Sequence, residues 1–410
     1  MLAFSALSCT LPTEMQNSGQ PGQSGCPQNC KIVGNAVMAL KPIPLNFVTL
    51  YADLAQNVRA STHEHGSVVA RKRRGREYLY VVNKDGLERT ETYLGPADDS
   101  AVAEQAAALR QGAEQAKALR STVSLLKQAR IPAPSLYLGR VLEVVANAGL
   151  FSQGVTLVGT AAFQTYACIL GYHLPGAAVM TNDADLLIAS FVANEEKKDI
   201  EEILQRADPT FKAQMSINDK LPKVFRSNAN FSVDILTTYR RGRTSPVLVE
   251  ELSCSAEALT FMEYLAEDSM EAVALYGAGV LVRVPPPERY AVHKLLIAQE
   301  RRGKFAAKKK KDLDQARDLL DILLETNEHS LQSALDDARG RGRAWKTAIN
   351  ASLKEIGRDT RQGRLPLIVT KLEAGKFSVS ERPLVRSNSS RRKVTEEPKV
   401  TKSSSRSQRR

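Results

Sequence analysis

The sequence is 410 residues long, with 43% hydrophobic and 25% charged residues, which is the composition of an ordinary globular protein. This composition excludes a chain that is disordered throughout, and no apolar run approaches the ~20 residues of a membrane span. Lysine and arginine number 57 against 45 aspartates and glutamates, so the formal net charge is +12. Polyanions such as nucleic acid or nucleotides are therefore favoured as partners, and no membrane is.

The cysteines indicate a reducing compartment. Five cysteines are an odd number for a large chain, which predicts free thiols, no disulfide framework and a cytoplasmic location. Cys26 and Cys30 have no second Cys or His pair nearby, so unstructured thiols are favoured over a zinc site. His63 and His65 lack a third ligand, which favours a surface segment.

The N-terminal part predicts a tail followed by a helix-and-hairpin module. Residues 1–37 are rich in Gln, Ser, Gly and Pro and are predicted to be disordered, so Met38 is a candidate for the natural start. Residues 38–130 predict an amphipathic helix, a β-hairpin with its turn at 83–86, and a long Ala-rich helix over 99–129. On the hairpin, Tyr78 and Tyr80 are expected to pack inward; the alternative is a basic, aromatic surface that stacks on nucleic acid.

After the long helix, the pattern predicts a mixed core, a helical region and a second tail. Residues 131–252 alternate helix and strand signals, which is typical of an α/β or α+β domain. Residues 253–380 are interpreted as a mostly helical C-terminal domain, and residues 381–410 as a disordered basic tail. The run Lys308 to Lys311 could attract a polyanion, although such runs are usually solvated.

Two aspartates stand at the head of a predicted buried strand, TNDADLLIA. Side chains at i and i+2 of a strand point to one face, so Asp183 and Asp185 should project together. Carboxylates held this close repel unless a cation lies between them, and hard oxygen ligands suit Mg²⁺. Alone, the motif is weak, because a pair of exposed carboxylates at a strand end has the same pattern.

Two further elements support a shared site. In LVGTAAF, a strand ends at Gly159 and a helix opens at Thr160, a turn that can approach a phosphate but that is also common as a simple helix cap. In SVDIL, Asp234 lies in a strand among apolar neighbours. A buried charge needs a partner, and a neighbouring strand that carries Asp183 and Asp185 would complete a shared metal site with Asp234.

These residues, in this order, resemble the signature of the nucleotidyltransferase fold of the DNA polymerase β superfamily. The stretches LVGTAAFQTYACILG, TNDADLLIA and VPPPERYAVHKLLIAQERR are similar to a bacterial nucleotidyltransferase-fold family, over about residues 38–357. The chain also resembles, more distantly, the AbiEii-type toxin nucleotidyltransferases, which have a threonine two residues before the first aspartate. In this chain that threonine is Thr181. The resemblance implies an α+β fold, with a small mixed sheet flanked by helices, an N-terminal β-hairpin and helix module, and a helical C-terminal region. The sequence departs from the usual pattern in the long spacing from Gly159 to Asp183, 183 − 159 = 24.

The resemblance also implies roles for seven residues. The metal ligands and catalytic residues would be Asp183, Asp185 and Asp234, the last binding a second ion or acting as a base. Gly159 and Thr160 would hold the triphosphate of an NTP. Lys294 would contact nucleotide phosphates, and Asp312 belongs to a motif of the AbiEii-type relatives that would also serve nucleotide binding.

The function expected from this resemblance is Mg²⁺-dependent transfer of a nucleoside monophosphate from an NTP to an acceptor, which is RNA, tRNA, a protein or a small molecule. The alternative is a catalytically silent protein of the same fold that binds nucleic acid or regulates. A toxin role would add a cognate antitoxin-like protein as a partner. Retention of all three aspartates favours the enzyme.

Overall fold

The computed structural model describes residues 41–61, 67–85, 87–178, 181–189, 197–215, 220–239, 245–301 and 303–359. The predictions for the two tails, for Met38, for the Cys26 and Cys30 pair and for the His63 and His65 pair lie outside these residues. Within the described residues, no helix combines the length and apolar character needed to cross a membrane. Cys168 and Cys254 are both buried free thiols, as predicted.

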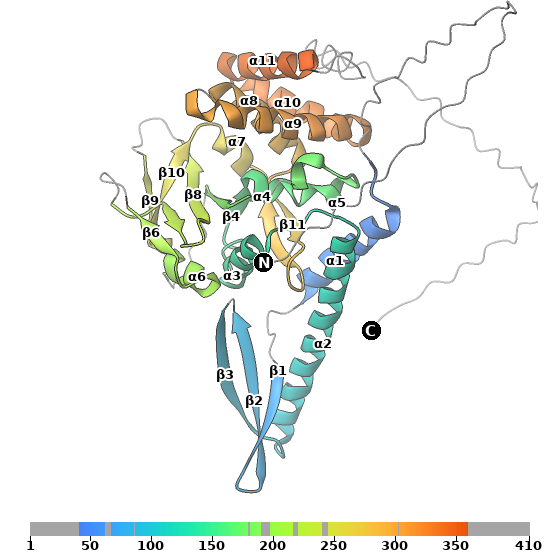
Figure 1. Cartoon of the computed structure of the whole chain (residues 1–410), viewed down its shortest axis with the longest axis vertical. Helices are drawn as coiled ribbons and strands as arrows, with labels where there is room; N and C mark the ends of the chain where they lie inside the picture. Colours follow the sequence, from blue (N-terminus) through green and yellow to red (C-terminus); the bar gives the residue numbers. More distant parts are fainter. Residues whose placement is uncertain are drawn as a thin grey trace, which may run out of the picture. The chain divides into compact units, whose positions relative to one another are not determined.

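The N-terminal module is a three-stranded antiparallel sheet beside a long helix (Figure 1). Asp99 caps the long helix, since its carboxylate accepts a hydrogen bond from the backbone N–H of Ala101 at 2.9 Å. The structure adds a first strand to the two of the predicted hairpin. In chain order the elements are α1 (Leu45–Ala60), β1 (Ser67–Arg73), β2 (Arg76–Asp85), β3 (Glu88–Pro96) and α2 (Ser100–Gln128).

The central domain is built on a mixed sheet with the order β4-β5-β8-β10-β9, and β7 joins it by pairing with β8 and β6. β4 is antiparallel to β5, whereas β5, β8 and β10 are parallel. The elements are α3 (Leu136–Asn147), β4 (Val155–Val158), α4 (Gly159–Phe163), α5 (Tyr166–Leu170), η1 (Pro175–Ala178), β5 (Asp183–Ile188), α6 (Ile200–Ala207), β6 (Lys212–Gln214), β7 (Val224–Arg226), β8 (Ser232–Thr238), β9 (Val247–Val249), η2 (Glu250–Leu252) and β10 (Cys254–Leu259).

The sheet continues beyond residue 252, where sequence patterns place the end of the core, because β10 pairs with β8. A two-stranded antiparallel sheet, β11-β12, then precedes the helices. α8, α9, α10 and α11 form one group of helices in Figure 1. The elements are α7 (Met262–Ala266), β11 (Met270–Ala274), β12 (Val280–Val284), α8 (Pro287–Glu300), η3 (Gly303–Phe305), α9 (Ala306–Thr326), α10 (Glu328–Gly340) and α11 (Arg343–Asp359).

Apolar side chains hold the strands that carry the predicted site. Leu157 of β4, Leu186 of β5 and Ile235 of β8 are each at most 1% exposed. Burying a side chain of this size contributes ~1.5–3 kcal/mol, so these strands form a rigid frame. The aspartates at one end of β5 and β8 are therefore held by a packed core.

Candidate active site

The register of β5 and β8 brings the predicted aspartates together. The two strands are parallel, and Asp185 lies directly beside Asp234, while Asp183 lies beside Ser232. Residues paired across neighbouring strands point to the same face. All three aspartates therefore project from one face of the sheet.

The turn after β4 is placed against these carboxylates. Val158, the last residue of β4, pairs with Asp185, and the chain then turns at Gly159 with a φ of +66°. A Cβ atom at this position would collide with Oδ2 of Asp185, and a left-handed φ disfavours any other residue. Glycine is thus required here for two independent reasons, and the long spacing to Asp183 does not separate the turn from the pair.

Two threonines and a tyrosine support the site. The hydroxyl of Thr181, which is buried, donates a hydrogen bond to Oδ1 of Asp183. Thr160 is buried within α4 immediately after the glycine. The hydroxyl of Tyr290, on α8, donates to the backbone carbonyl of Gly159 at 2.8 Å. The helical region thereby holds the turn in place, a contact for which the sequence carries no signal.

The three carboxylates repel each other. Burial, followed by the charges of Asp183 and Asp234, raises the pKa of Asp185 to about 6. Burial and the charge of Asp183 likewise raise the pKa of Asp234. Carboxylates that share one face of a sheet and repel each other suit a hard divalent ion, whose charge would offset the repulsion. Among the described residues, no three His, Cys, Asp or Glu side chains are arranged closely enough to hold a metal as they stand.

The raised pKa of Asp185 predicts a dependence of stability on pH. The folded chain binds this proton more tightly than the unfolded chain, so the contribution is fully present below the ordinary value of 3.8 and is lost as pH rises through about 6. At about pH 8 in EDTA, Asp185→Asn should therefore be more stable than wild type by about 1–3 kcal/mol. Urea denaturation measures this difference, which should shrink as the pH falls towards about 5.

The matched control for this measurement is Asp199→Asn. Asp199 caps α6 by accepting from the N–H of Glu201 at 2.8 Å, and asparagine caps helices equally well. This control makes the same chemical change outside the three carboxylates, so it measures the effect of exchanging an aspartate for an asparagine as such. A pH-independent difference for Asp185→Asn would contradict the proposed repulsion.

Lys294 and Asp312, both predicted to bind nucleotide, form a buried ion pair. Nζ of Lys294 lies 2.7 Å from Oδ1 of Asp312, and Nε of Arg301 lies 2.9 Å from Oδ2 of the same carboxylate. Lys294 and Asp312 are 6% and 3% exposed. Burial raises the pKa of Asp312, but Lys294 and Arg301 outweigh it and hold that pKa below its ordinary value. The pair joins α8 to α9, and the charge of Lys294 acts on Asp185.

Two lysines of the basic run at the start of α9 act electrostatically on the carboxylates. The charge of Lys308 lowers the pKa of both Asp185 and Asp234. Burial and the charge of Lys294 lower the pKa of Lys311, whereas the charge of Asp183 acts to raise it. The sequence leaves this run open between attraction of a polyanion and simple solvation, and Lys308 is exposed. The signal in the sequence is the lysine cluster itself, two residues of which interact electrostatically with the aspartates.

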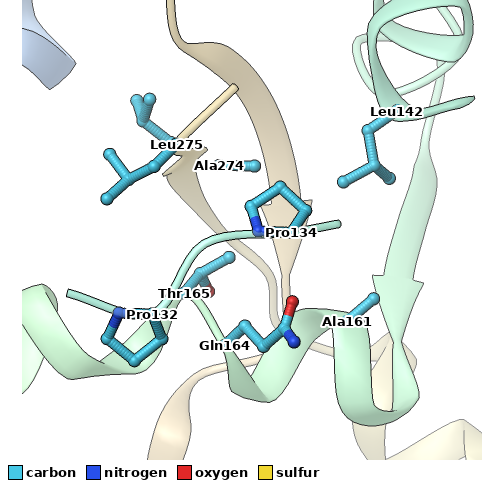
Figure 2. Close-up of a pocket in the computed structure, with 9 residues that line it drawn as sticks. Pro132, Pro134, Leu142, Ala161, Gln164, Thr165, Ala274 and Leu275 are labelled. Carbon is cyan, nitrogen blue, oxygen red and sulfur yellow. The ribbon is translucent and has the colours of Figure 1, made fainter. Parts of the chain in front are cut away.

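The pocket in Figure 2 is not this site. It is lined by Pro132, Pro134, Leu142, Ala161, Gln164, Thr165, Val273, Ala274 and Leu275, and none of the aspartates contributes. Its volume of about 10 Å³ leaves room for about one water molecule, so it cannot accept a nucleotide.

A family model and a solved structure match parts of the chain. Residues 137–340 match the model of a family described as Nucleotidyltransferase. The α+β nucleotidyltransferase fold predicted from the sequence is thereby confirmed. A crystal structure of an antigenic nucleotidyltransferase-like protein from Paracoccidioides brasiliensis is similar at 14% identity with a TM-score of 0.25, covering 57% of this chain and 92% of that chain. No curated protein matches the chain.

Proposed function

We propose that the protein is a Mg²⁺-dependent nucleotidyltransferase that transfers a nucleoside monophosphate from an NTP to an acceptor. The observation that carries this proposal is the convergence of Asp183, Asp185 and Asp234 beside the turn at Gly159. The acceptor is RNA, tRNA, a protein side chain or a small molecule. A hydroxyl or phosphate oxygen of the acceptor attacks the α-phosphorus, the bond to the bridging oxygen of the β-phosphate breaks, and pyrophosphate leaves.

The three aspartates would hold Mg²⁺, which, when bound, supplies positive charge at the reacting phosphate and lowers the cost of the charge that develops there. Asp234 would accept the proton of the attacking group, and its raised pKa supports this role because it makes the carboxylate a stronger base than an ordinary aspartate. Thr181 holds the carboxylate of Asp183 in its orientation through their hydrogen bond.

The triphosphate would lie between the turn after β4 and the start of α9. Gly159 offers backbone without a side chain in the way, and Thr160 follows it at the start of α4. Lys308 and Lys311 offer positive charge that can neutralise β- and γ-phosphates. The pairing of Lys294 with Asp312 makes a direct contact of Lys294 with phosphate depend on a rearrangement of that pair.

The test is transfer of label from each NTP, labelled in turn at the α- and γ-phosphate, with Mg²⁺ and either total RNA or protein extract. We expect the α-label to appear on the acceptor while the γ-label leaves as pyrophosphate. Label transfer that survives EDTA would contradict the role of the metal. No α-label on any acceptor, together with binding of RNA, would support the catalytically silent alternative.

A further inference from the structure

The sheet β1-β2-β3 has two unlike faces. On one face, Leu79 and Val81 of β2 are 5% and 6% exposed. Gly95 of β3 also faces α2, because a Cβ atom there would overlap with the side chain of Val102. α2 therefore covers this face and buries its aliphatic side chains.

The opposite face carries three tyrosines instead of aliphatic residues. Tyr80 of β2 lies directly beside Tyr93 of β3, with ring centroids 5.4 Å apart, and Tyr78 lies 6.1 Å from the same ring. Tyr93 is 51% exposed. The inward packing expected for Tyr78 and Tyr80 is thus wrong, since the aliphatic residues between them take the covered side.

The tyrosine-bearing face is also basic. By strand register, four arginines share it, and Glu91 is the one acidic side chain that the described residues of these strands add to it. One of the arginines, Arg76, also pairs with the exposed carboxylate of Asp98, just after β3, at 2.8 Å. The guanidinium of Arg71 lies 5.7 Å from the centroid of the Tyr80 ring and pairs with Glu91 at 2.7 Å. This pair is well exposed, and such pairs are weak, so a phosphate can replace the carboxylate. The four arginines are Arg71, Arg73, Arg76 and Arg89.

The turn between β1 and β2 concentrates the same charge. Arg74 and Gly75 both have positive φ, 49° and 82°, as a tight two-residue hairpin turn requires. Lys72 and Arg73 come directly before this turn and Arg76 directly after it. The hairpin therefore ends in four basic side chains.

We propose that this face of β1-β2-β3 binds single-stranded nucleic acid, with bases stacked on the tyrosines and phosphates on the arginines. The exposed ring of Tyr93 and the half-buried rings of Tyr78 and Tyr80 lie beside guanidinium groups, so this face has both components that single-strand binding uses, stacking and charge neutralisation. Duplex is disfavoured because its bases are already stacked on one another. This binding needs neither NTP nor metal, so it can be tested independently of the transfer reaction.

The experiment measures fluorescence anisotropy of a labelled oligouridine RNA with the full-length protein in EDTA. Tyr80→Ala/Tyr93→Ala should raise Kd at least ~10-fold, because base stacking on each aromatic side chain is lost. Tyr80→Phe/Tyr93→Phe should bind as wild type does, because it keeps the rings. Tyr239→Ala, which removes a tyrosine 47% exposed elsewhere, controls for the loss of an exposed ring.

Salt dependence tests the charge. Arg73→Gln/Arg89→Gln should weaken binding and reduce the slope of log Kd against log salt by about 1–2. The control Arg343→Gln/Lys346→Gln, on α11, lowers the net charge by the same amount as the sheet variant. It should leave both the Kd and the slope of log Kd against log salt unchanged. The proposal is overturned if the alanine pair binds within ~2-fold of wild type, or if the α11 variant weakens binding as much as the sheet variant. If the wild-type protein binds RNA but transfers no nucleotide, only the proposed function is contradicted. If it transfers nucleotide but Tyr80→Ala/Tyr93→Ala binds RNA with unchanged affinity, only the present proposal is contradicted.

Discussion

Asp183→Asn is expected to lower the rate of nucleotidyl transfer by at least about 10³-fold while leaving the protein folded. Asp183 is the central charge of the site, since it raises the pKa of both Asp185 and Asp234. Asparagine keeps the oxygen that accepts the hydrogen bond from Thr181, so the substitution removes the charge and preserves the local contact. The measurement is the rate of release of pyrophosphate at saturating NTP and Mg²⁺.

Asp199→Asn makes the same chemical change outside the site and should retain wild-type activity. The two variants should also differ in the effect of Mg²⁺ on thermal stability. Mg²⁺ should raise the Tm of wild type and of Asp199→Asn. The rise in Tm should be much smaller for Asp183→Asn. If Asp183→Asn keeps activity within ~10-fold of wild type, the assignment of Asp183 as a metal ligand is wrong.

The sequence identifies the strand ends that carry chemistry because their signals are local. The spacing of Asp183 and Asp185 and the glycine at 159 are short patterns, and the strands that contain them are continuous apolar runs. The pairing of strands, in contrast, joins residues that are far apart in the sequence, so short patterns do not determine it. The pairing of Asp185 with Asp234 joins positions 49 residues apart (234 − 185), and only the packing of β5 against β8 determines it.

Sequence periodicity also leaves open which face of a strand is covered. Alternation places Leu79 and Val81 opposite Tyr78 and Tyr80, but it does not say which set meets a helix. The approach of α2 to Gly95 decides it, and that contact is tertiary. The effect of Lys308 and Lys311 on the carboxylates is likewise tertiary, because it depends on where the packing of α9 against α8 places these lysines.

Asp312→Ala is expected to destabilise the protein by about 3–5 kcal/mol, because it leaves the ammonium of Lys294 buried without its carboxylate. Arg301 also loses its partner, but its side chain is 31% exposed and water can replace the contact. Urea denaturation measures the effect. Asp314→Ala on the same helix removes a carboxylate that pairs with the exposed Lys310, and it should cost less than ~1 kcal/mol.

The double variant Lys294→Met/Asp312→Leu separates a structural role from nucleotide binding. Replacing both charges with apolar side chains of similar size should recover most of the lost stability, because neither charge is then left buried alone. If Lys294 contacts phosphate, this folded variant should have a KM for NTP raised about 10-fold or more, the effect of losing one charged contact. An unchanged KM would show that the pair joins α8 to α9 and nothing more, and would leave Lys308 and Lys311 as the lysines that face the triphosphate.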